Sequence, residues 1–244
     1  MATMDKVALV TGGAKRIGAV LVARLHAMGY RVGVHYNSSH THALALAEGL
    51  NHERADSALL LEGDLAADQT PVRLIEQLLA RWGRCDALIN NASVFHPTKV
   101  DGITRQDWDA IMSVNLRAPF MLSQAASPYL RESQGCIINL TDIYGERPLP
   151  AHSVYSMSKA GLIMMTRSLA LELAPDVRVN GISPGAVLWP EQADAAHTAA
   201  ILNKTALRRS GSPDDIAQAA AYLLTADYVT GQVLAVDGGR MLHI

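Results

Sequence analysis

A tyrosine and a lysine four residues apart form the first pair in this chain that could carry chemistry. Tyr155 and Lys159 stand in a segment of helical character, and residues at this spacing lie on one face of a helix. The Lys159 ammonium is therefore expected beside the Tyr155 hydroxyl. A neighbouring cation favours the phenolate, so we expect it to lower the pKa of Tyr155 and to make this side chain a proton donor. The spacing also arises by chance, so other motifs must support it.

A glycine-containing turn near the N-terminus is the second candidate. Residues 11–18 join an apolar run to a segment of helical period, with glycine at Gly12, Gly13 and Gly18. Glycines let the backbone approach a pyrophosphate, and the N-terminus of the next helix offers free N–H groups and a positive dipole end. An ordinary strand-to-helix turn is the alternative. The strand before and the helix after are the context that makes dinucleotide binding credible.

The elements that must position these residues alternate along the chain. Apolar runs predict strands at 6–10, 31–36, 58–62, 86–90, 136–140, 177–182 and 232–236. Most are continuously hydrophobic, as expected of parallel strands covered on both faces. Helical periodicity fills the segments between them, for example from about Arg16 to Met28 with Gly29 as the stop. We therefore predict one α/β domain over residues 1–244, a Rossmann-type doubly wound parallel sheet of about seven strands with helices on both faces.

Composition excludes several classes of partner. The chain has 21 basic and 23 acidic residues and no basic stripe, so no nucleic-acid partner is expected. No run reaches the roughly 18 apolar residues that span a bilayer, and no signal peptide is recognised, so no membrane association is expected. Cys85 and Cys136 are expected to be buried free thiols, which fits a reducing, cytoplasmic location. The nine histidines lack the spacing of a metal site, so no metal is expected.

Five motifs together resemble the short-chain dehydrogenase/reductase family, in matching order over essentially the whole chain. They are the turn at 11–18, Asn90-Asn91-Ala92, Asn115, Tyr155 with Lys159, and Pro184-Gly185. The resemblance implies that Asn115 has a structural and proton-relay role and that Pro184-Gly185 closes over the nicotinamide carboxamide. The chain departs from the family where Arg16 replaces the middle glycine of the turn and Ser93 replaces the glycine after Asn-Asn-Ala.

The region after the second strand indicates which dinucleotide is bound. NAD-specific sites place a carboxylate there to hold the ribose 2′-hydroxyl, but residues 35–39 contain no acid. Their small donors, with Lys15 and Arg16, suit a 2′-phosphate, so we expect NADPH. Asp64 resembles the family residue at the adenine, or is a turn aspartate. The predicted cofactor-binding set is Thr11, Lys15, Arg16, Ile17, His35, Tyr36, Asn37, Ser38, Ser39, Asp64, Leu65, Asn91, Ala92, Ser93, Thr141, Tyr155, Lys159, Pro184, Gly185 and Val187.

An aspartate marks the departure that suggests a substrate. Most family members carry a serine about 13 residues before the tyrosine, where it hydrogen-bonds the substrate carbonyl, and Asp142 stands there in this chain. An ionised aspartate would repel a developing oxyanion, but it suits a ring nitrogen that must be protonated. Asp142 together with Arg16 and Phe95 resembles the pteridine reductases, the dihydromonapterin reductases included. Ser38 departs from their pattern, which typically has arginine there.

The resemblance implies roles for the residues around a pterin. Phe95 would stack on the pterin face opposite the nicotinamide, while Arg16 and Ser93 would lie near the pterin and the cofactor phosphate. The predicted catalytic residues are Asp142, Tyr155, Lys159 and Asn115, and the predicted substrate-binding residues are Arg16, Ser93, Phe95, Asp142, Tyr155 and Trp189. Three alternatives stay open: Phe95 as ordinary core, Asp142 as a turn residue beside a ketone site, and Trp189 as a loop anchor. Segment 186–209 is expected to be a flap over the site.

These features predict an NADPH-dependent pteridine reductase that takes dihydropterin, and oxidised pterin, to the tetrahydro form. The alternative is a generic carbonyl reductase acting on 3-oxoacyl or sugar-like ketones. A non-catalytic NADPH-sensing protein is a third hypothesis, which the presence of Asn115, Tyr155 and Lys159 disfavours. The resemblance also implies a homotetramer, paired through the long helices near Asn115 and Tyr155.

Overall fold

A parallel sheet organises the chain, as the apolar runs predict. The structure is a computed structural model that describes residues 5–189 and 194–242. The sheet has seven strands in the order β3-β2-β1-β4-β5-β6-β7, and each neighbouring pair is parallel. The strands are β1 (Val7–Val10), β2 (Arg31–Tyr36), β3 (Ala58–Glu62), β4 (Ala87–Asn90), β5 (Cys136–Leu140), β6 (Arg178–Pro184) and β7 (Val233–Val236). The predicted fold class is confirmed, and each predicted strand lies within two residues of the observed one.

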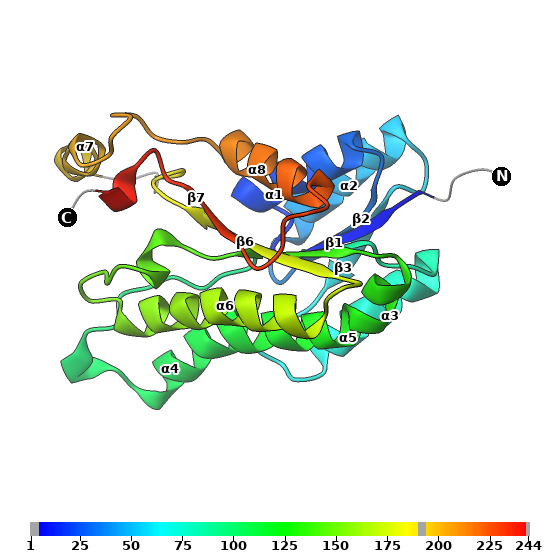
Figure 1. Cartoon of the computed structure of the whole chain (residues 1–244), viewed down its shortest axis with the longest axis horizontal. Helices are drawn as coiled ribbons and strands as arrows, with labels where there is room; N and C mark the ends of the chain where they lie inside the picture. The colour runs from blue at the N-terminus through cyan, green and yellow to red at the C-terminus, as the bar shows by residue number, and fades with distance from the viewer. Residues whose placement is uncertain (1–4, 190–193, 243–244) are drawn as a thin grey trace.

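Helices cover both faces of the sheet (Figure 1). The helices are α1 (Arg16–Ala27), α2 (His40–Glu53), α3 (Thr70–Trp82), α4 (Arg105–Met112), α5 (Ala118–Glu132), α6 (Ser153–Glu172), α7 (Ala195–Asn203) and α8 (Pro213–Thr225). Figure 1 shows α1, α2 and α8 on one side of the sheet and α3, α5 and α6 on the other. Each layer encloses its own apolar core against the strands, so the strands are buried on both faces as parallel strands require.

Local signals in the sequence set the ends of several helices. The α1 helix stops before Gly29, whose φ of +91° is left-handed, and α3 stops at Gly83 with φ +72°. At the start of α8, the Ser212 hydroxyl accepts from the Asp215 N–H while the Asp215 carboxylate accepts from the Ser212 N–H. This reciprocal capping satisfies two N–H groups at the start of the helix.

The strand order places a crevice at the carboxyl ends of β1 and β4. The chain runs outward from β1 to β3 on one side and from β4 to β7 on the other, so consecutive connections leave in opposite directions at this point. Ligands of open α/β sheets bind in the crevice outside such a switch point. Residues 11–18 follow β1 and residues 91–95 follow β4, so both predicted binding loops meet there.

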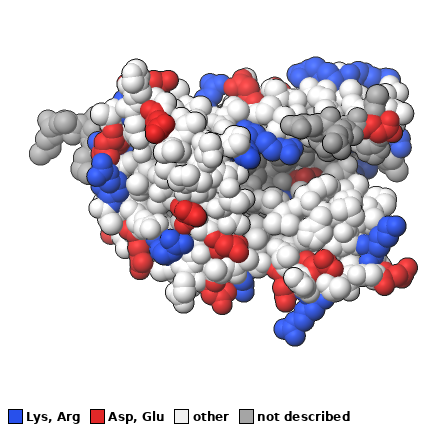
Figure 2. All heavy atoms as spheres, turned by 180° about the vertical axis from the view of Figure 1, so that it is seen from behind, with Lys and Arg blue, Asp and Glu red and all other residues white. Residues whose placement is uncertain are grey.

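The predicted flap segment 186–209 contains a helix of its own. α7 occupies Ala195–Asn203 within it, and residues 190–193 lie outside the described part of the chain. Both signs of charge are interspersed over the face that Figure 2 shows, and a hollow opens on that face. Within residues 5–189 and 194–242, no helix has the length and apolar character needed to cross a membrane.

Candidate active site

The turn after β1 presents the open end of α1 to the crevice. The cap residue of α1, Lys15, makes no side-chain cap hydrogen bond, so the first N–H groups of the helix are not satisfied by a capping side chain. Gly12 has a left-handed φ of +60°, and a Cβ on Gly18 would lie 2.0 Å from the Gly12 carbonyl oxygen. The turn therefore folds tightly against the helix it starts. Such a helix N-terminus binds phosphate through its N–H groups and dipole.

Arg16 occupies the position where the family has its middle glycine, and its backbone explains why glycine is usual there. Its φ is +54°, in the left-handed region that glycine adopts without steric cost. A non-glycine residue in this region stores about 1 kcal/mol or more of strain. The Arg16 side chain lines the cavity at the carboxyl ends of the strands.

His35 connects the turn to the loop after β3. Its buried ring accepts a hydrogen bond from the Gly12 N–H at Nδ1 (3.1 Å), and Nε2 lies 3.0 Å from the Gly63 carbonyl oxygen. Burial lowers the pKa of His35 to about 4, so the ring is neutral at pH 7 and Nε2 carries the hydrogen. Both nitrogens are thus engaged by backbone. His35 also lines the cavity, so its place in the cofactor-binding set stays a prediction, and its ring in addition holds the turn.

The Tyr36 side chain is held by neighbouring polar side chains. Its hydroxyl lies 2.7 Å from His40 Nδ1 and donates to Glu62 Oε2 at 3.2 Å, and the side chain does not line the cavity. Neighbouring strand residues face opposite sides of a sheet, so only alternate side chains can face the same layer. The Tyr36 side chain therefore does not line the cavity, whereas Asn37 does, and the predicted cofactor contact of Tyr36 stays a prediction.

Hydrogen bonds join the turn to the loop after β4. The Thr11 hydroxyl accepts from the N–H groups of Asn91 (2.9 Å) and Ala92 (3.0 Å). The Asn91 amide donates to the carbonyl oxygens of Thr11 (2.8 Å) and Gly12 (3.1 Å). The two loops are therefore one rigid unit at the switch point. Thr11 acts inside this unit and does not line the cavity.

Asn115 ties the loop after β4 to α6. It lies in a π-helical turn, Ser113–Arg117, between α4 and α5, and such turns frequently occur at functional sites. Its amide nitrogen donates to the Val94 carbonyl (2.9 Å) and to the Ser158 hydroxyl (3.1 Å), and its oxygen accepts from the Val94 N–H (2.7 Å). All three contacts position other elements, and Asn115 is buried.

The predicted proton-delivery residues meet at the carboxyl end of β5. The Tyr155 hydroxyl donates to Asp142 Oδ2 at 2.7 Å, and the Tyr144 N–H donates to Asp142 Oδ1 at 2.9 Å. Lys159 Nζ donates to the Leu140 carbonyl at 2.8 Å and lies 5.7 Å from the Tyr155 ring centroid. The structure thus brings Asp142, Tyr155 and Lys159 together, although the lysine contacts backbone rather than the phenol.

Electrostatics at this site differ from the sequence prediction. Burial, and after it the Asp142 carboxylate, raises the pKa of Tyr155 above its ordinary value instead of lowering it. Burial also lowers the pKa of Lys159 to about 8, against the opposing influence of Asp142. The carboxyl of Asp142 has a raised pKa because burial outweighs the hydrogen bonds from Tyr144 and Tyr155. The predicted lowering of the Tyr155 pKa by the adjacent ammonium is therefore not found in this structure.

Phe95 is a wall of the cavity and not a core residue. Its side chain is 56% exposed and lines the same cavity as Asp142 and Tyr155. The Phe95 ring meets Tyr155 edge to face, with centroids 4.7 Å apart and planes at 84°. The alternative of ordinary core for Phe95 is thereby excluded.

Trp189 serves as an anchor for its own segment. Its indole N–H donates to the Ser210 hydroxyl at 2.8 Å, and the Gly211 N–H donates to the Ala186 carbonyl at 3.0 Å. Trp189 does not line the cavity, so the loop-anchor interpretation describes this structure. Gly185 is needed for close packing, because a Cβ there would lie 2.7 Å from the Asp237 Cα.

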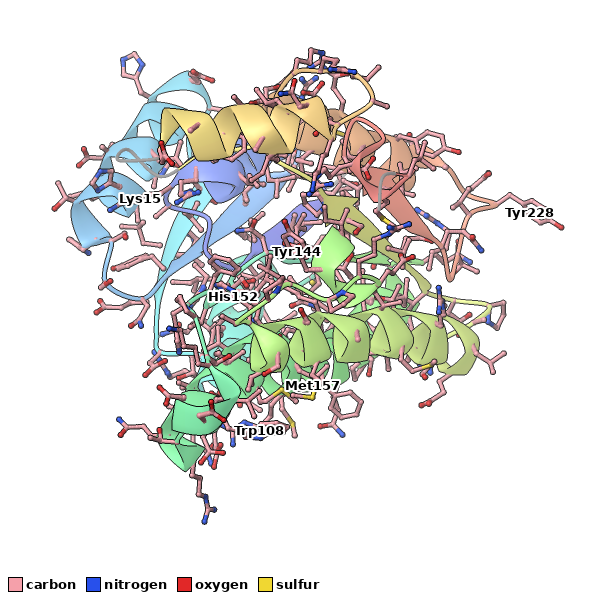
Figure 3. The ribbon with its side chains drawn as sticks, turned by 90° about the vertical axis from the view of Figure 1, so that its left-hand side faces the viewer. Lys15, Trp108, Tyr144, His152, Met157 and Tyr228 are labelled. Atoms are coloured by element: carbon pink, nitrogen blue, oxygen red, sulfur yellow. The ribbon has the colours of Figure 1, made fainter. Side chains whose placement is uncertain are left out.

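A cavity of about 720 Å³ connects the turn to the proton-delivery residues, and a second of about 180 Å³ adjoins it. Figure 3 looks onto this side, with Tyr144 and His152 near the centre and Lys15 beside them. Predicted residues that line one or both cavities are Lys15, Arg16, Ile17, His35, Asn37, Asp64, Leu65, Asn91, Ala92, Ser93, Phe95, Thr141, Asp142, Tyr155, Lys159, Pro184, Gly185 and Val187. Predicted residues that line neither are Thr11, Tyr36, Ser38, Ser39, Asn115 and Trp189.

Apart from the turn glycines, five lining residues were not predicted from the sequence. They are Val94, Val114, Leu140, Tyr144 and Leu188. Tyr144 follows the end of β5, two residues after Asp142. This position just after a strand end was the signal that could have placed Tyr144 in the crevice. The other four are ordinary apolar residues next to predicted ones and carry no signal of their own.

The residues present fit a dinucleotide. The cavity is bordered by the uncapped N-terminus of α1 and is also lined by Asn37, Asp64 and Tyr155. In the described ranges, no three His, Cys, Asp or Glu side chains are grouped to hold a metal ion. Fold and site together define a dinucleotide-dependent oxidoreductase.

The comparisons place this oxidoreductase in a family. The chain belongs to the short-chain dehydrogenase/reductase family, whose members use NAD(P)H, and residues 12–241 match the family profile described as Enoyl-(Acyl carrier protein) reductase. It is 34% identical to Pteridine reductase 1 of Leishmania tarentolae over 97% of this chain and 96% of that protein. It is also 34% identical to the 3-oxoacyl-[acyl-carrier-protein] reductase FabG of Staphylococcus aureus over 98% of this chain and 99% of that one. The comparisons thus assign oxidoreductase chemistry without separating pterin from ketone substrates.

Proposed function

We propose that the chain is an NADPH-dependent pteridine reductase that reduces dihydropterin, and oxidised pterin, to tetrahydropterin. The observation that carries this proposal is the 2.7 Å hydrogen bond from the Tyr155 hydroxyl to the Asp142 carboxyl, in the crevice beside Phe95. Resemblance to the Leishmania pteridine reductase over almost the full chain supports it.

A carboxyl group at position 142 favours nitrogen heterocycles over ketones. Reduction of a ketone develops negative charge on oxygen, and a buried carboxylate a few ångströms away would repel that charge strongly. Protonation of a ring nitrogen has the opposite requirement, because a proton donor or a negative partner stabilises it. Asp142 has a raised pKa in its buried position, which brings this carboxyl closer to the range where it holds a proton near neutrality.

Reduction of dihydropterin needs one hydride and one proton, and oxidised pterin needs two of each in two successive steps. When bound, NADPH supplies the hydride to a ring carbon of the C=N bond. The proton goes to the adjacent ring nitrogen from the Tyr155–Asp142 pair, so that C=N becomes CH–NH and the pair is left one proton short. Lys159, hydrogen-bonded to the Leu140 carbonyl, keeps a positive charge next to the pair that has lost the proton. Asn115 positions Ser93 and Val94 beside the reacting atoms.

NADPH, rather than NADH, is proposed from the adenosine end. The cavity is lined there by Lys15, Arg16 and Asn37, and none of residues 36–39 carries a carboxylate. Two cations suit a ribose 2′-phosphate, and an acid is what a 2′-hydroxyl site would use. Arg16 and Ser93 also line the pterin end, where they can contact the substrate, and Phe95 supplies a flat surface for its ring.

A homotetramer and a cytoplasmic location belong to the same proposal. A groove of about 1150 Å³ runs over α4, α5 and α6, with Phe120 and Met164 exposed along it. This apolar face suits a second copy of the chain, and light scattering on the purified protein measures the mass directly. Burial raises the pKa of the free Cys85 thiol to about 12 and that of Cys136 to about 11, and such inert thiols fit a reducing compartment.

A substrate panel tests the proposal. Oxidation of NADPH and of NADH is followed by absorbance with dihydrobiopterin, dihydromonapterin, a 3-oxoacyl thioester and a sugar-like ketone. We expect turnover of the dihydropterins with NADPH. Turnover of ketones alone would instead establish a carbonyl reductase, the second candidate, which the equal identity to the 3-oxoacyl reductase supports.

A further inference from the structure

An aromatic stack connects Phe95 to a histidine that no motif singles out. Phe95 lies in the loop after β4, and His152 lies directly before α6. Their ring centroids are 4.6 Å apart with planes only 13° from parallel. One face of the Phe95 ring is thereby covered by His152, and Phe95 also meets Tyr155 edge to face. Phe95 also lines the cavity.

Backbone contacts join the same two loops. The Thr98 N–H donates to the Ala151 carbonyl at 2.6 Å, and Thr98 and His152 form a parallel β-bridge. Ala151 adopts a φ of +59°, a left-handed conformation that a non-glycine residue keeps only when its surroundings impose it. His152 Nδ1 also lies 2.9 Å from the Pro150 carbonyl oxygen, which orients the imidazole. The position of His152 is therefore fixed by contacts that do not involve Phe95.

We propose that His152 is a positioning residue that holds the Phe95 ring as one wall of the substrate site. Phe95 is more than half exposed, so without a neighbour its ring would lose rotational freedom each time a ligand stacked on it. The His152 ring fixes that plane in advance, and a wall ordered beforehand binds more tightly because less entropy is lost on binding. The choice of a flat heterocycle as ligand rests on the proposed function, whereas the coupling between the two rings does not.

Two substitutions at position 152 test whether the flat shape of the His152 ring is the property that matters. His152→Ala removes the stack and is expected to raise KM for dihydrobiopterin about fivefold to tenfold, in line with the usual strength of an aromatic pair, with kcat and the Kd for NADPH much less affected. His152→Phe keeps a flat ring and is expected to restore KM to within about twofold of wild type. His152 makes no side-chain cap bond to α6, so its loss should not unfold the helix. Tyr228→Ala, at a fully exposed aromatic residue, is the matched control and should leave KM unchanged.

A double-mutant cycle shows whether His152 acts through Phe95. Four proteins are compared: wild type, Phe95→Ala, His152→Ala and the double variant. If the histidine only positions Phe95, KM of the double variant should equal that of Phe95→Ala, because the second change has nothing left to disturb. Effects on KM that multiply, or a Phe95→Ala variant with unaltered KM, overturn the inference.

The same experiment distinguishes failure of the proposed function from failure of the inference about His152. Wild-type protein that turns over a 3-oxoacyl thioester and no dihydropterin refutes the pteridine assignment. The same four proteins are then compared on the thioester, and the coupling between Phe95 and His152 is decided on that substrate by the same criterion.

Discussion

Replacing the Tyr155 hydroxyl by hydrogen tests the proton-delivery pair. In Tyr155→Phe, the ring keeps its packing and its edge contact with Phe95, while Asp142 loses the 2.7 Å hydrogen bond from the phenol. The Tyr144 N–H still donates to Asp142 Oδ1. The hydrogen bond from Tyr155 holds the pKa of Asp142 down, so the carboxyl of the variant should take up a proton at a higher pH than that of the wild type.

The expected size of the effect follows from this geometry. A buried hydrogen bond to a charged group contributes about 1.5–3 kcal/mol to stability, and protonation of Asp142 offsets part of its loss. For a chain of this size, 1 kcal/mol corresponds to about 2–4 °C in Tm, so we expect a fall of about 3–8 °C. Loss of a general acid lowers kcat by about 100- to 10,000-fold. The Kd for NADPH should change by no more than about twofold, because the turn at 11–18 is untouched.

The assay separates chemistry from binding. Turnover of dihydrobiopterin is followed by NADPH oxidation, the cofactor Kd by quenching of NADPH or tryptophan fluorescence, and Tm by calorimetry. Tyr228→Phe, at a fully exposed tyrosine, is the control and should match wild type in all three. A Tyr155→Phe variant that keeps more than a tenth of wild-type kcat would refute the proton-delivery role of the hydroxyl.

Three further predictions follow from the same site. Asp142→Asn should raise Tm near pH 7.5 and lose this advantage near pH 4. The folded-state pKa of Asp142 is raised, so the stability that the Asp142 carboxyl contributes is full below its unfolded pKa and is lost as pH rises through its folded pKa. An equal gain in Tm at both pH values would contradict this reasoning. Because the pKa of Lys159 is about 8, kcat/KM should fall above that pH as the ammonium loses its proton; a profile flat to pH 10 would show that this charge is not used. Gly18→Ala should weaken NADPH binding more than about 100-fold by breaking the turn, because the added Cβ would lie 2.0 Å from the Gly12 oxygen. The control Gly49→Ala, whose Cβ meets nothing within 4 Å, should bind NADPH as wild type does, and similar affinities for the two variants would refute the role of the turn.

The fold was predictable because burial on both faces leaves a direct trace in the sequence. Strands such as Cys136–Leu140 are buried at every residue, so each appears as an unbroken apolar run. Helix ends were predictable where glycine or a capping serine marks them, as at Gly29 and Ser212. The α7 helix was not, because the alanine-rich segment that contains it lacks both a clear periodicity and a stop signal.

The site was only partly predictable, because spacing does not fix where a side chain points. The interval between Tyr155 and Lys159 places both on one helix face, but the lysine donates to the Leu140 carbonyl and burial dominates the pKa of the phenol. Strand position likewise does not tell that both His35 nitrogens engage the backbone. His152 and Phe95 lie far apart in sequence, and only the folded chain brings their rings together.

Exchanging the Asp142 carboxyl for a serine hydroxyl is the most direct test of substrate class. In Asp142→Ser, kcat/KM is determined for dihydrobiopterin and for a 3-oxoacyl thioester, each relative to wild type. We predict that the ratio of pterin to ketone efficiency falls by about 100-fold or more, with NADPH affinity retained. An Asp142→Ser variant that reduces dihydropterin as efficiently as wild type would contradict the assignment of this carboxyl to a nitrogen heterocycle.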